Sequence, residues 1–344
     1  MTLGITGGAA QEDDVVVDVG MPAYGGAEYL AEAIESVLAQ TFTRWRLAIC
    51  ENGPGGGPIA EAARPYLADP RVRYLATGTE LPMADNWTNA LHQGSAPYVA
   101  LFHDDDRWHP DFLANRVWAL ETHPACGFAY AQFVEIDGQG RQTWWAPVEN
   151  EEGVLDQSTL AGILTRSNPI VPPAIVVRRS AYEAVGAAFD PQWHYCDWEM
   201  WARLAARFPA YYLARHDNDY RRHPLANTYA RREDPAVLLA MIDRLESVFA
   251  AELPEFRLDH RDRSHNRSHI LLQSAWDVHQ VGGWRRSGPL YRAALRQFPL
   301  AVLDRMSLDM VAGSVLGRRG SEATASVLRH LRRTTGESGT SGVA

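Results

Sequence analysis

Residues 98–106 read Tyr-Val-Ala-Leu-Phe-His-Asp-Asp-Asp, so an apolar run leads directly into three consecutive carboxylates. The apolar run is typical of a buried strand, and ligands of α/β sheets bind where such strands end. Three adjacent carboxylates repel one another, and a divalent cation with oxygen ligands relieves that repulsion. Asp104, Asp105 and Asp106 therefore predict a site for a metal ion and a diphosphate. A solvated acidic turn is the alternative that the triplet alone leaves open.

The segments around this stretch alternate between strand and helix patterns. Short apolar or β-branched runs predict strands, and apolar residues between them recur at helical spacing. This alternation indicates βαβ units, an α/β fold and a mostly parallel sheet. The expected strands span residues 15–19, 45–50, 72–75, 98–102, 128–136, 142–145, 174–177 and 211–213, and the expected helices span 29–38, 59–67, 83–92, 110–120 and 197–207.

The character of the chain changes at Pro235, after which apolar residues keep helical spacing and no strand is predicted. Residues 236–344 carry 15 arginines against 11 acidic residues, whereas the rest carries 18 against 31, so the net charges are +4 and −13. We predict four regions. They are a disordered N-terminus over 1–14, an α/β domain over 15–234, an all-helical extension over 235–335 and a disordered tail over 336–344.

The composition excludes several classes of protein. The 344 residues include no lysine, so a Schiff-base lysine, a pyridoxal-phosphate anchor and a P-loop lysine are all excluded. The net charge of −9 argues against nucleic acid as a partner. The three cysteines are far apart and fit neither a disulfide framework nor a zinc site. No signal peptide and no long apolar run is recognised, so we expect a cytoplasmic protein.

Several motifs together resemble family 2 glycosyltransferases, over about Val15 to Asn227. The likeness rests on Val17–Tyr24, Glu28–Thr41, Leu81–Leu91, Phe102–Pro110, His194–Trp201 and Tyr220–His223. The resemblance implies the GT-A fold, a Rossmann-like mixed sheet flanked by helices. It also implies an inverting, metal-dependent transferase that moves a sugar from a UDP-, dTDP- or GDP-linked donor to an acceptor hydroxyl of unknown type. Cell-surface polysaccharide or secondary-metabolite glycosylation would be its setting.

The resemblance also implies roles, position by position. Asp197, which by its own pattern predicts a helix N-cap, stands where the family has its catalytic base. Asp106 and His223 would hold Mn²⁺ or Mg²⁺. The nucleotide sugar would contact Pro22, Ala23, Tyr24, Glu51, Asn52, Asp85, Asn86, Asp104, Asp105 and Arg221. Trp193, Tyr195 and Trp198 would contact the acceptor, because sugar CH faces stack on aromatic rings.

The sequence departs from the family pattern at two positions. Glu51 replaces the usual aspartate, which leaves the preferred nucleotide base open, and Cys196 replaces the usual glutamate. A second hypothesis therefore stays open, that of a non-catalytic sugar-nucleotide-binding or scaffold protein on the same fold. For the helical extension we expect one of three roles: forming a homodimer, covering the acceptor cleft, or contacting an anionic membrane surface weakly, at the inner face of the membrane.

Overall fold

The computed structural model describes residues 15–148, 150–223, 234–303 and 307–308. The chain forms two compact units, of which one comprises Met1–Ala226 with Asp243–Arg257 and the other Asn227–Ile242 with Leu258–Ala344. Helix α8 (Pro235–Glu252) begins where the helical extension was predicted to begin, but its two halves fall into different units. The units therefore do not divide at a single residue. The segments predicted to be disordered, 1–14 and 336–344, lie outside the described residues.

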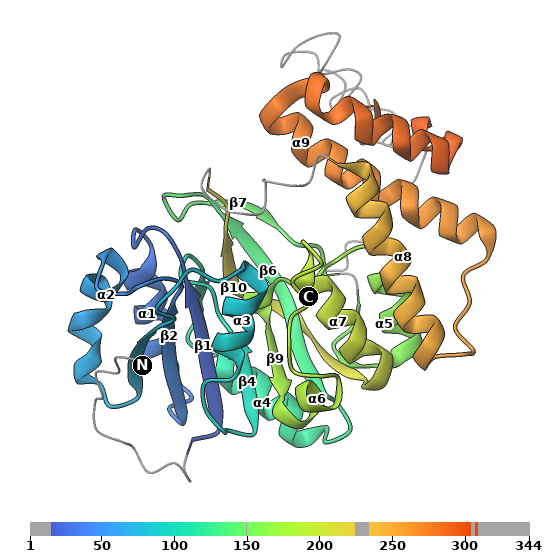
Figure 1. The fold of residues 1–344 in the computed structure, drawn as a ribbon. Helices are drawn as coiled ribbons and strands as arrows, with labels where there is room; N and C mark the ends of the chain where they lie inside the picture. Colours follow the sequence, from blue (N-terminus) through green and yellow to red (C-terminus); the bar gives the residue numbers. More distant parts are fainter. Residues whose placement is uncertain (1–14, 149, 224–233, 304–306, 309–344) are drawn as a thin grey trace, which may run out of the picture. The chain divides into compact units, whose positions relative to one another are not determined.

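The larger unit is built on a sheet of ten strands (Figure 1). The strands are β1 (Val17–Ala23), β2 (Trp45–Glu51), β3 (Val72–Ala76), β4 (Tyr98–Leu101), β5 (Arg107–Trp108), β6 (Phe128–Ile136), β7 (Gln142–Trp145), β8 (Gly153–Leu155), β9 (Ile175–Arg178) and β10 (Ala210–Arg221). Their order is β3-β2-β1-β4-β9-β6-β10-β5, with β7 paired to β6 and β8 paired to β10.

The directions of the strands bring several strand ends to one edge. Strands β3, β2, β1 and β4 are mutually parallel. Strand β9 runs antiparallel to both β4 and β6, and β10 runs parallel to β6. The carboxyl ends of β1, β2, β4, β6 and β10 therefore lie at the same edge. This mixed sheet confirms the predicted fold class, including the hairpin of β6 and β7.

Helices cover the sheet and enclose its core. They are α1 (Leu30–Leu38), α2 (Pro58–Ala63), η2 (Arg64–Ala68), α3 (Met83–Leu91), α4 (Phe112–Thr122), α5 (Gln157–Leu164), η3 (Pro172–Ala174), α6 (Arg179–Ala184) and α7 (Cys196–Arg207). Apolar side chains of β1, β2, α1, α2 and α4 form a continuous buried cluster. Helix α3 packs so closely on β1 that a Cβ atom at Gly20 would stand 2.3 Å from the Ala90 carbonyl oxygen.

Strand β10 was only partly predicted, because polar residues interrupt its apolar pattern. A short strand over residues 211–213 was expected there, and the structure shows one longer, bulged strand. Its Asp217 and Asp219 are buried, and each forms an ion pair, with Arg116 at 2.7 Å and with Arg107 at 2.6 Å. Burial of charged groups is tolerated when they are paired in this way.

Helices also make up the described part of the second unit. Helix α9 (His260–Gln297) is followed by η5 (Pro299–Leu303). A break divides α9 at Gly283, whose φ of 62° is a backbone conformation that glycine adopts freely. No helix among the described residues is long and apolar enough to cross a membrane.

Candidate functional site

The carboxylate segment after β4 is held from both sides by backbone groups. The amide of Tyr24, just after β1, donates to Asp104 Oδ2 at 3.2 Å. The amide of Arg221, at the end of β10, donates to Asp106 Oδ1 at 2.8 Å. The ends of β1, β4 and β10 thus converge on this segment.

A possible ligand set for a cation lies within the segment itself. One ligand atom each from His103, Asp105 and Asp106 lies within 4.8 Å of the others. The side chain of Asp106 is fully buried, and His103 Nδ1 lies 3.5 Å from its Oδ2. Within the described part of the chain, Asp106 Oδ2 and His103 Nε2 have no hydrogen-bond partner. Buried polar atoms without partners are costly, so the arrangement fits an additional positively charged ligand.

Burial and neighbouring charges shift the pKa values of the titratable side chains in this segment. Burial and the neighbouring charge of Asp105 raise the pKa of Asp104 to about 7 and that of Asp106 to about 6. Burial would lower the pKa of His103, but the contact with Asp106 and the nearby carboxylates raise it overall. The segment therefore holds more negative charge than its own side chains neutralise.

Arg221 was predicted to contact the nucleotide sugar, and the structure corrects this. Its guanidinium is buried, with Nη2 donating to Glu32 at 2.6 Å and Nε donating to the Asp105 carbonyl at 2.7 Å. Nη1 donates to the Asp137 carbonyl at 3.1 Å, and the group lies over the Tyr29 ring. Arg221 thus stabilises the wall behind the carboxylates.

The predicted metal ligands are only partly brought together. Asp106 belongs to the three-residue cluster, whereas His223 lies beside it, with Nε2 3.1 Å from Asp105 Oδ2. His103 was not predicted as a ligand, and Asp105 was assigned to the nucleotide. The signal for His103 was its place at the end of an apolar run, directly before the aspartates.

The residues at the ends of β1 and β2 that were predicted to contact the nucleotide differ in how far their side chains are free to bind a ligand. Pro22 and Ala23 are buried within β1, and both amide atoms of Asn52 are bonded to the backbone of Leu81, at 2.9 and 2.7 Å. Nucleotide contacts through these three side chains are therefore not supported. Tyr24 is 57% exposed, and its hydroxyl donates to Glu80 at 2.7 Å.

Glu51 ends β2 and is nearly buried, at 8% exposure. Its Oε2 accepts a short hydrogen bond from the Tyr74 hydroxyl. Burial, reinforced by this bond, raises the pKa of Tyr74 to about 12, so the phenol stays protonated and remains the donor.

The two predicted residues on α3 point in different directions. Asn86 is buried, and its Nδ2 lies 3.5 Å from the carbonyl oxygen of Cys50 in β2. Its side chain is therefore directed at the sheet, which does not support a nucleotide contact. Asp85 is half-buried in the first turn of α3, and its role stays a prediction.

Asp197 lies in the first turn of α7, one residue inside the helix. The N-cap is Tyr195, so the predicted capping role of Asp197 is wrong. Its Oδ2 accepts from Asn168 Nδ2 at 3.2 Å. Burial raises the pKa of Asp197, while the Trp198 amide and the charge of His103 act in the opposite direction. His103 precedes the three aspartates, so its effect on the pKa of Asp197 connects Asp197 electrostatically with the carboxylate segment.

The three aromatic residues predicted to contact the acceptor divide into two kinds. Trp198 is buried, and its indole Nε1 donates to the Leu164 carbonyl at 2.9 Å, so it offers no stacking face and that prediction is wrong. Trp193 and Tyr195 are both partly exposed just before α7, and their contact with an acceptor stays a prediction. Cys196 is fully buried.

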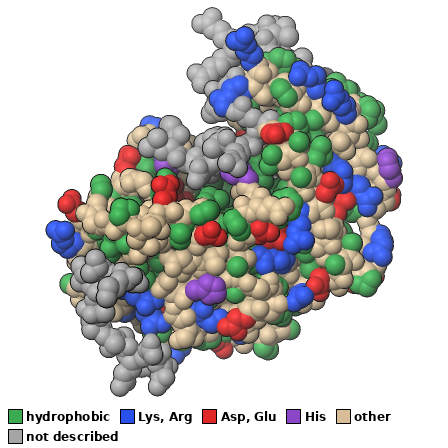
Figure 2. All heavy atoms as spheres, viewed as in Figure 1, with side chains coloured by type: hydrophobic (Ala, Val, Ile, Leu, Met, Phe, Trp, Pro, Cys, Tyr) green, Lys and Arg blue, Asp and Glu red, His purple; other side chains and the backbone are tan. Residues whose placement is uncertain are grey.

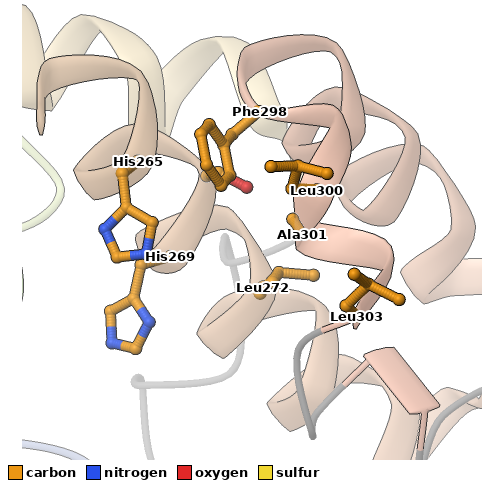
Figure 3. A pocket seen from close by; sticks show the side chains of 8 residues that line it. His265, His269, Leu272, Phe298, Leu300, Ala301 and Leu303 are labelled. Carbon is orange, nitrogen blue, oxygen red and sulfur yellow. The ribbon is translucent and has the colours of Figure 1, made fainter. Parts of the chain in front are cut away.

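A separate cavity of about 240 Å³ lies in the second unit, between α9 and η5 (Figure 3). Its lining combines apolar side chains with two imidazoles and a serine, and the residues are His265, Ser268, His269, Leu272, Phe298, Leu300, Ala301 and Leu303. It contains none of the predicted site residues.

On the face of the molecule seen in Figure 2, acidic and basic side chains are interspersed.

The fold and the acidic edge are typical of α/β proteins, whose ligands bind at the carboxyl ends of parallel strands. The family model for glycosyl transferase family 2 matches residues 18–186, which include β1 to β4 and the carboxylate segment. This part of the chain, slightly less than half of its length, therefore matches glycosyl transferase family 2.

Relatives in sequence and structure agree with this assignment. EpsE of Bacillus subtilis (strain 168) is 26% identical over 174 residues, covering 49% of this chain and 58% of EpsE. The Escherichia coli UDP-Glc:alpha-D-GlcNAc-diphosphoundecaprenol beta-1,3-glucosyltransferase WfgD is 27% identical over 105 residues, 30% of this chain and 39% of WfgD. The chain thus spans less than two thirds of these relatives.

Solved structures with a similar fold match most of the length of the chain. The structure of S. aureus TarS 1–349 in complex with UDP-GlcNAc has a TM-score of 0.59 at 14% identity, covering 93% of this chain and 92% of that one. The mannosyltransferase PcManGT from Pyrobaculum calidifontis, in complex with GDP-Man and Mn²⁺, has a TM-score of 0.53 at 15% identity, covering 94% and 88%.

Proposed function

We propose that this chain is a metal-dependent, inverting glycosyltransferase that moves a sugar from a nucleoside-diphosphate sugar to an acceptor hydroxyl. The observation that carries the proposal is the buried carboxylate segment, whose Asp106 Oδ2 and His103 Nε2 lack hydrogen-bond partners among the described residues. The family match supports the reaction class, and the complexes of TarS and PcManGT support the donor class.

The donor set in this segment fits Mn²⁺ or Mg²⁺. His103, Asp105 and Asp106 would hold the ion, since the carboxylate oxygens of the two aspartates suit both cations. Such an ion neutralises the charge that develops on the diphosphate leaving group. Side-chain cations are a poor substitute here, because the chain has no lysine and Arg107 and Arg221 are committed to carboxylates.

The nucleoside would extend from the carboxylate segment across the end of β1 to the end of β2. Neighbouring strands lie roughly 4.8 Å apart, so Glu51 stands about two strand spacings from β4. That separation suits a nucleoside whose phosphates lie at Asp106 and whose base lies at Glu51. The exposed ring of Tyr24 lies between these points and can flank the nucleoside.

Asp197 is proposed as the catalytic base. It would accept the proton of the acceptor hydroxyl while that oxygen attacks the anomeric carbon and the bond to the diphosphate breaks. A single displacement of this kind inverts the anomeric configuration. Its raised pKa makes the carboxylate a stronger base than an ordinary aspartate, and Asn168 fixes one of its oxygens. Trp193 and Tyr195 precede the same helix and would flank the acceptor.

Relatives suggest a biological setting. WfgD acts on a sugar linked to diphosphoundecaprenol, and a chondroitin synthase of Escherichia coli is 29% identical over 126 residues, 36% of this chain and 18% of that one. Their names support a role in building a cell-surface polysaccharide.

The proposal is tested by measuring release of nucleoside diphosphate from UDP-, dTDP- and GDP-sugars with Mn²⁺ or Mg²⁺, first with water and then with sugar acceptors. Asp197→Asn should lower turnover by about 10³-fold while nucleotide binding is retained. Glu61→Gln, on the exposed side of α2, is the control and should be neutral. Full turnover in Asp197→Asn would refute the assignment of the base. Metal-dependent nucleotide binding without any turnover in the parent protein would support a non-catalytic binding role instead.

A further inference from the structure

The environment of Glu51 bears on which nucleotide base the site accepts. Tyr74 stands on β3 opposite Ile49, so its side chain and that of Glu51 lie on the same face of the sheet. The backbone around Glu51 is fixed as well, because its carbonyl accepts from the Thr77 amide at 3.0 Å and the Asn52 amide donates to Ala23 at 2.8 Å. The carboxylate is therefore held in one position.

The Tyr74 hydroxyl is itself held by the glycine-rich loop after β2. The Gly56 amide donates to it at 3.3 Å, and the hydroxyl in turn donates to Glu51 Oε2. A Cβ atom at Gly55 would stand 2.9 Å from that hydroxyl and 2.7 Å from the Cβ of Ala76, so the loop can approach only as glycine. The phenol thus engages one oxygen of Glu51, and the loop holds the phenol in place.

The other oxygen, Oε1, faces Gly57. A Cβ atom built on Gly57 would lie 3.9 Å from Oε1, so any side chain at this position would contact that oxygen, whereas the glycine does not. Glu51 therefore presents one oxygen toward the loop, with its partner oxygen engaged by Tyr74.

The nucleotide bases make different demands on such a group. Guanine carries an N–H and an NH₂ side by side, and a carboxylate binds this pair best with both oxygens in a bidentate arrangement. Uracil and thymine carry a single N–H between two carbonyls, and one carboxylate oxygen satisfies it. We infer that the site selects a uracil or thymine nucleoside diphosphate over a guanine one, and that Tyr74 is the positioning residue that sets this selection. The inference rests on the proposed function, because it places the base at Glu51.

The test measures binding of UDP, dTDP and GDP, each with Mn²⁺, by isothermal titration calorimetry. In the parent protein UDP or dTDP should bind about tenfold more tightly than GDP, which corresponds to one hydrogen bond to a charged group. Tyr74→Phe frees Oε2 and should bring this ratio to about threefold or less, chiefly by improving GDP binding. Glu51→Gln should weaken UDP binding by about tenfold.

Tyr66→Phe is the matched control, because the Tyr66 hydroxyl also donates to a carboxylate, that of Glu35, at 2.8 Å. It should leave the ratio unchanged, so a general loss of stability cannot imitate the effect. A GDP affinity equal to or above that of UDP in the parent protein would overturn the inference and leave the proposed function intact. An unchanged ratio in Tyr74→Phe would overturn the role of Tyr74. Failure of all three nucleotides to bind would overturn the proposed function and the inference together.

Discussion

Two groups of aspartates, one in strand β10 and one in the segment after β4, have opposite surroundings. Asp217 and Asp219 on β10 each face an arginine. Against the effect of burial, Arg116 holds the pKa of Asp217 below its ordinary value, and His109 together with Arg107 does the same for Asp219. Asp104 and Asp106, after β4, have raised pKa values, and within the described residues neither forms an ion pair with an arginine.

The difference separates structural from functional acids. A buried carboxylate with a guanidinium partner completes the fold by itself, and removal of either partner leaves a costly charge behind. A buried carboxylate oxygen without a hydrogen-bond partner is costly, and a bound ligand can supply the missing partner. The β10 aspartates therefore stabilise the sheet, whereas the aspartates after β4 are the ones that we propose to bind a ligand.

The largest expected effect comes from Asp106→Asn. The change removes a proposed ligand of the ion, and we expect a loss of about 10³-fold in transfer, comparable to the removal of a key electrostatic group. The metal-free protein should keep or gain stability, because the change relieves repulsion between neighbouring carboxylates. Transfer assays and thermal unfolding check both expectations.

Mn²⁺ provides the control for this variant. It should raise the melting temperature of the parent protein by mass action and leave that of Asp106→Asn unchanged. If Asp106→Asn were strongly destabilised, Asp106 would stabilise the fold as Asp217 does. The contrast between the two groups of aspartates would then be wrong.

The next effect concerns Asp217→Asn, which leaves Arg116 buried with an unpaired charge. Breaking a buried ion pair of this kind costs about 3–5 kcal/mol of unfolding free energy. Urea denaturation of the metal-free protein measures it. Asp111→Asn is the control, because that carboxylate accepts an exposed hydrogen bond from Thr41 and should cost far less. A loss below about 1 kcal/mol for Asp217→Asn would be typical of a surface pair and would contradict a structural role.

Sequence patterns predicted the parallel strands and the acidic edge, because both are local. A buried strand shows in a short apolar run, and the aspartates follow it directly. The partners of buried charges could not be predicted in this way. Arg116 and Asp217 are 101 residues apart in the chain, and only the pairing of α4 with β10 brings them together. Because polar residues such as Asp217 interrupt the apolar pattern, β10 was predicted to be shorter than it is.

The same limit applies to the individual site residues. Trp193 and Trp198 look alike as aromatic neighbours of Asp197, but Trp198 lies on the buried face of α7 and Trp193 lies before the helix. Glu51 was recognised as a departure from the family pattern, whereas its bond to Tyr74 crosses from β2 to β3, a pairing that was not predicted from the sequence. Side-chain orientation and pairing across strands therefore had to come from the structure.

The smallest expected effect is the pH dependence of the Asp217 pair. Because the folded-state pKa of Asp217 is lowered, its ionised form stabilises the fold above the ordinary carboxyl pKa, which is about 3.9. That contribution is lost as the pH falls through the lowered folded-state pKa. The stability difference between the parent protein and Asp217→Asn should thus stay constant from neutral pH to about pH 4 and shrink below it. Urea titrations at a series of pH values measure this difference. If it instead shrank between neutral pH and pH 5, the carboxyl would be titrating with a raised pKa, as an acid without its arginine does, and the contrast between the two groups of aspartates would fail.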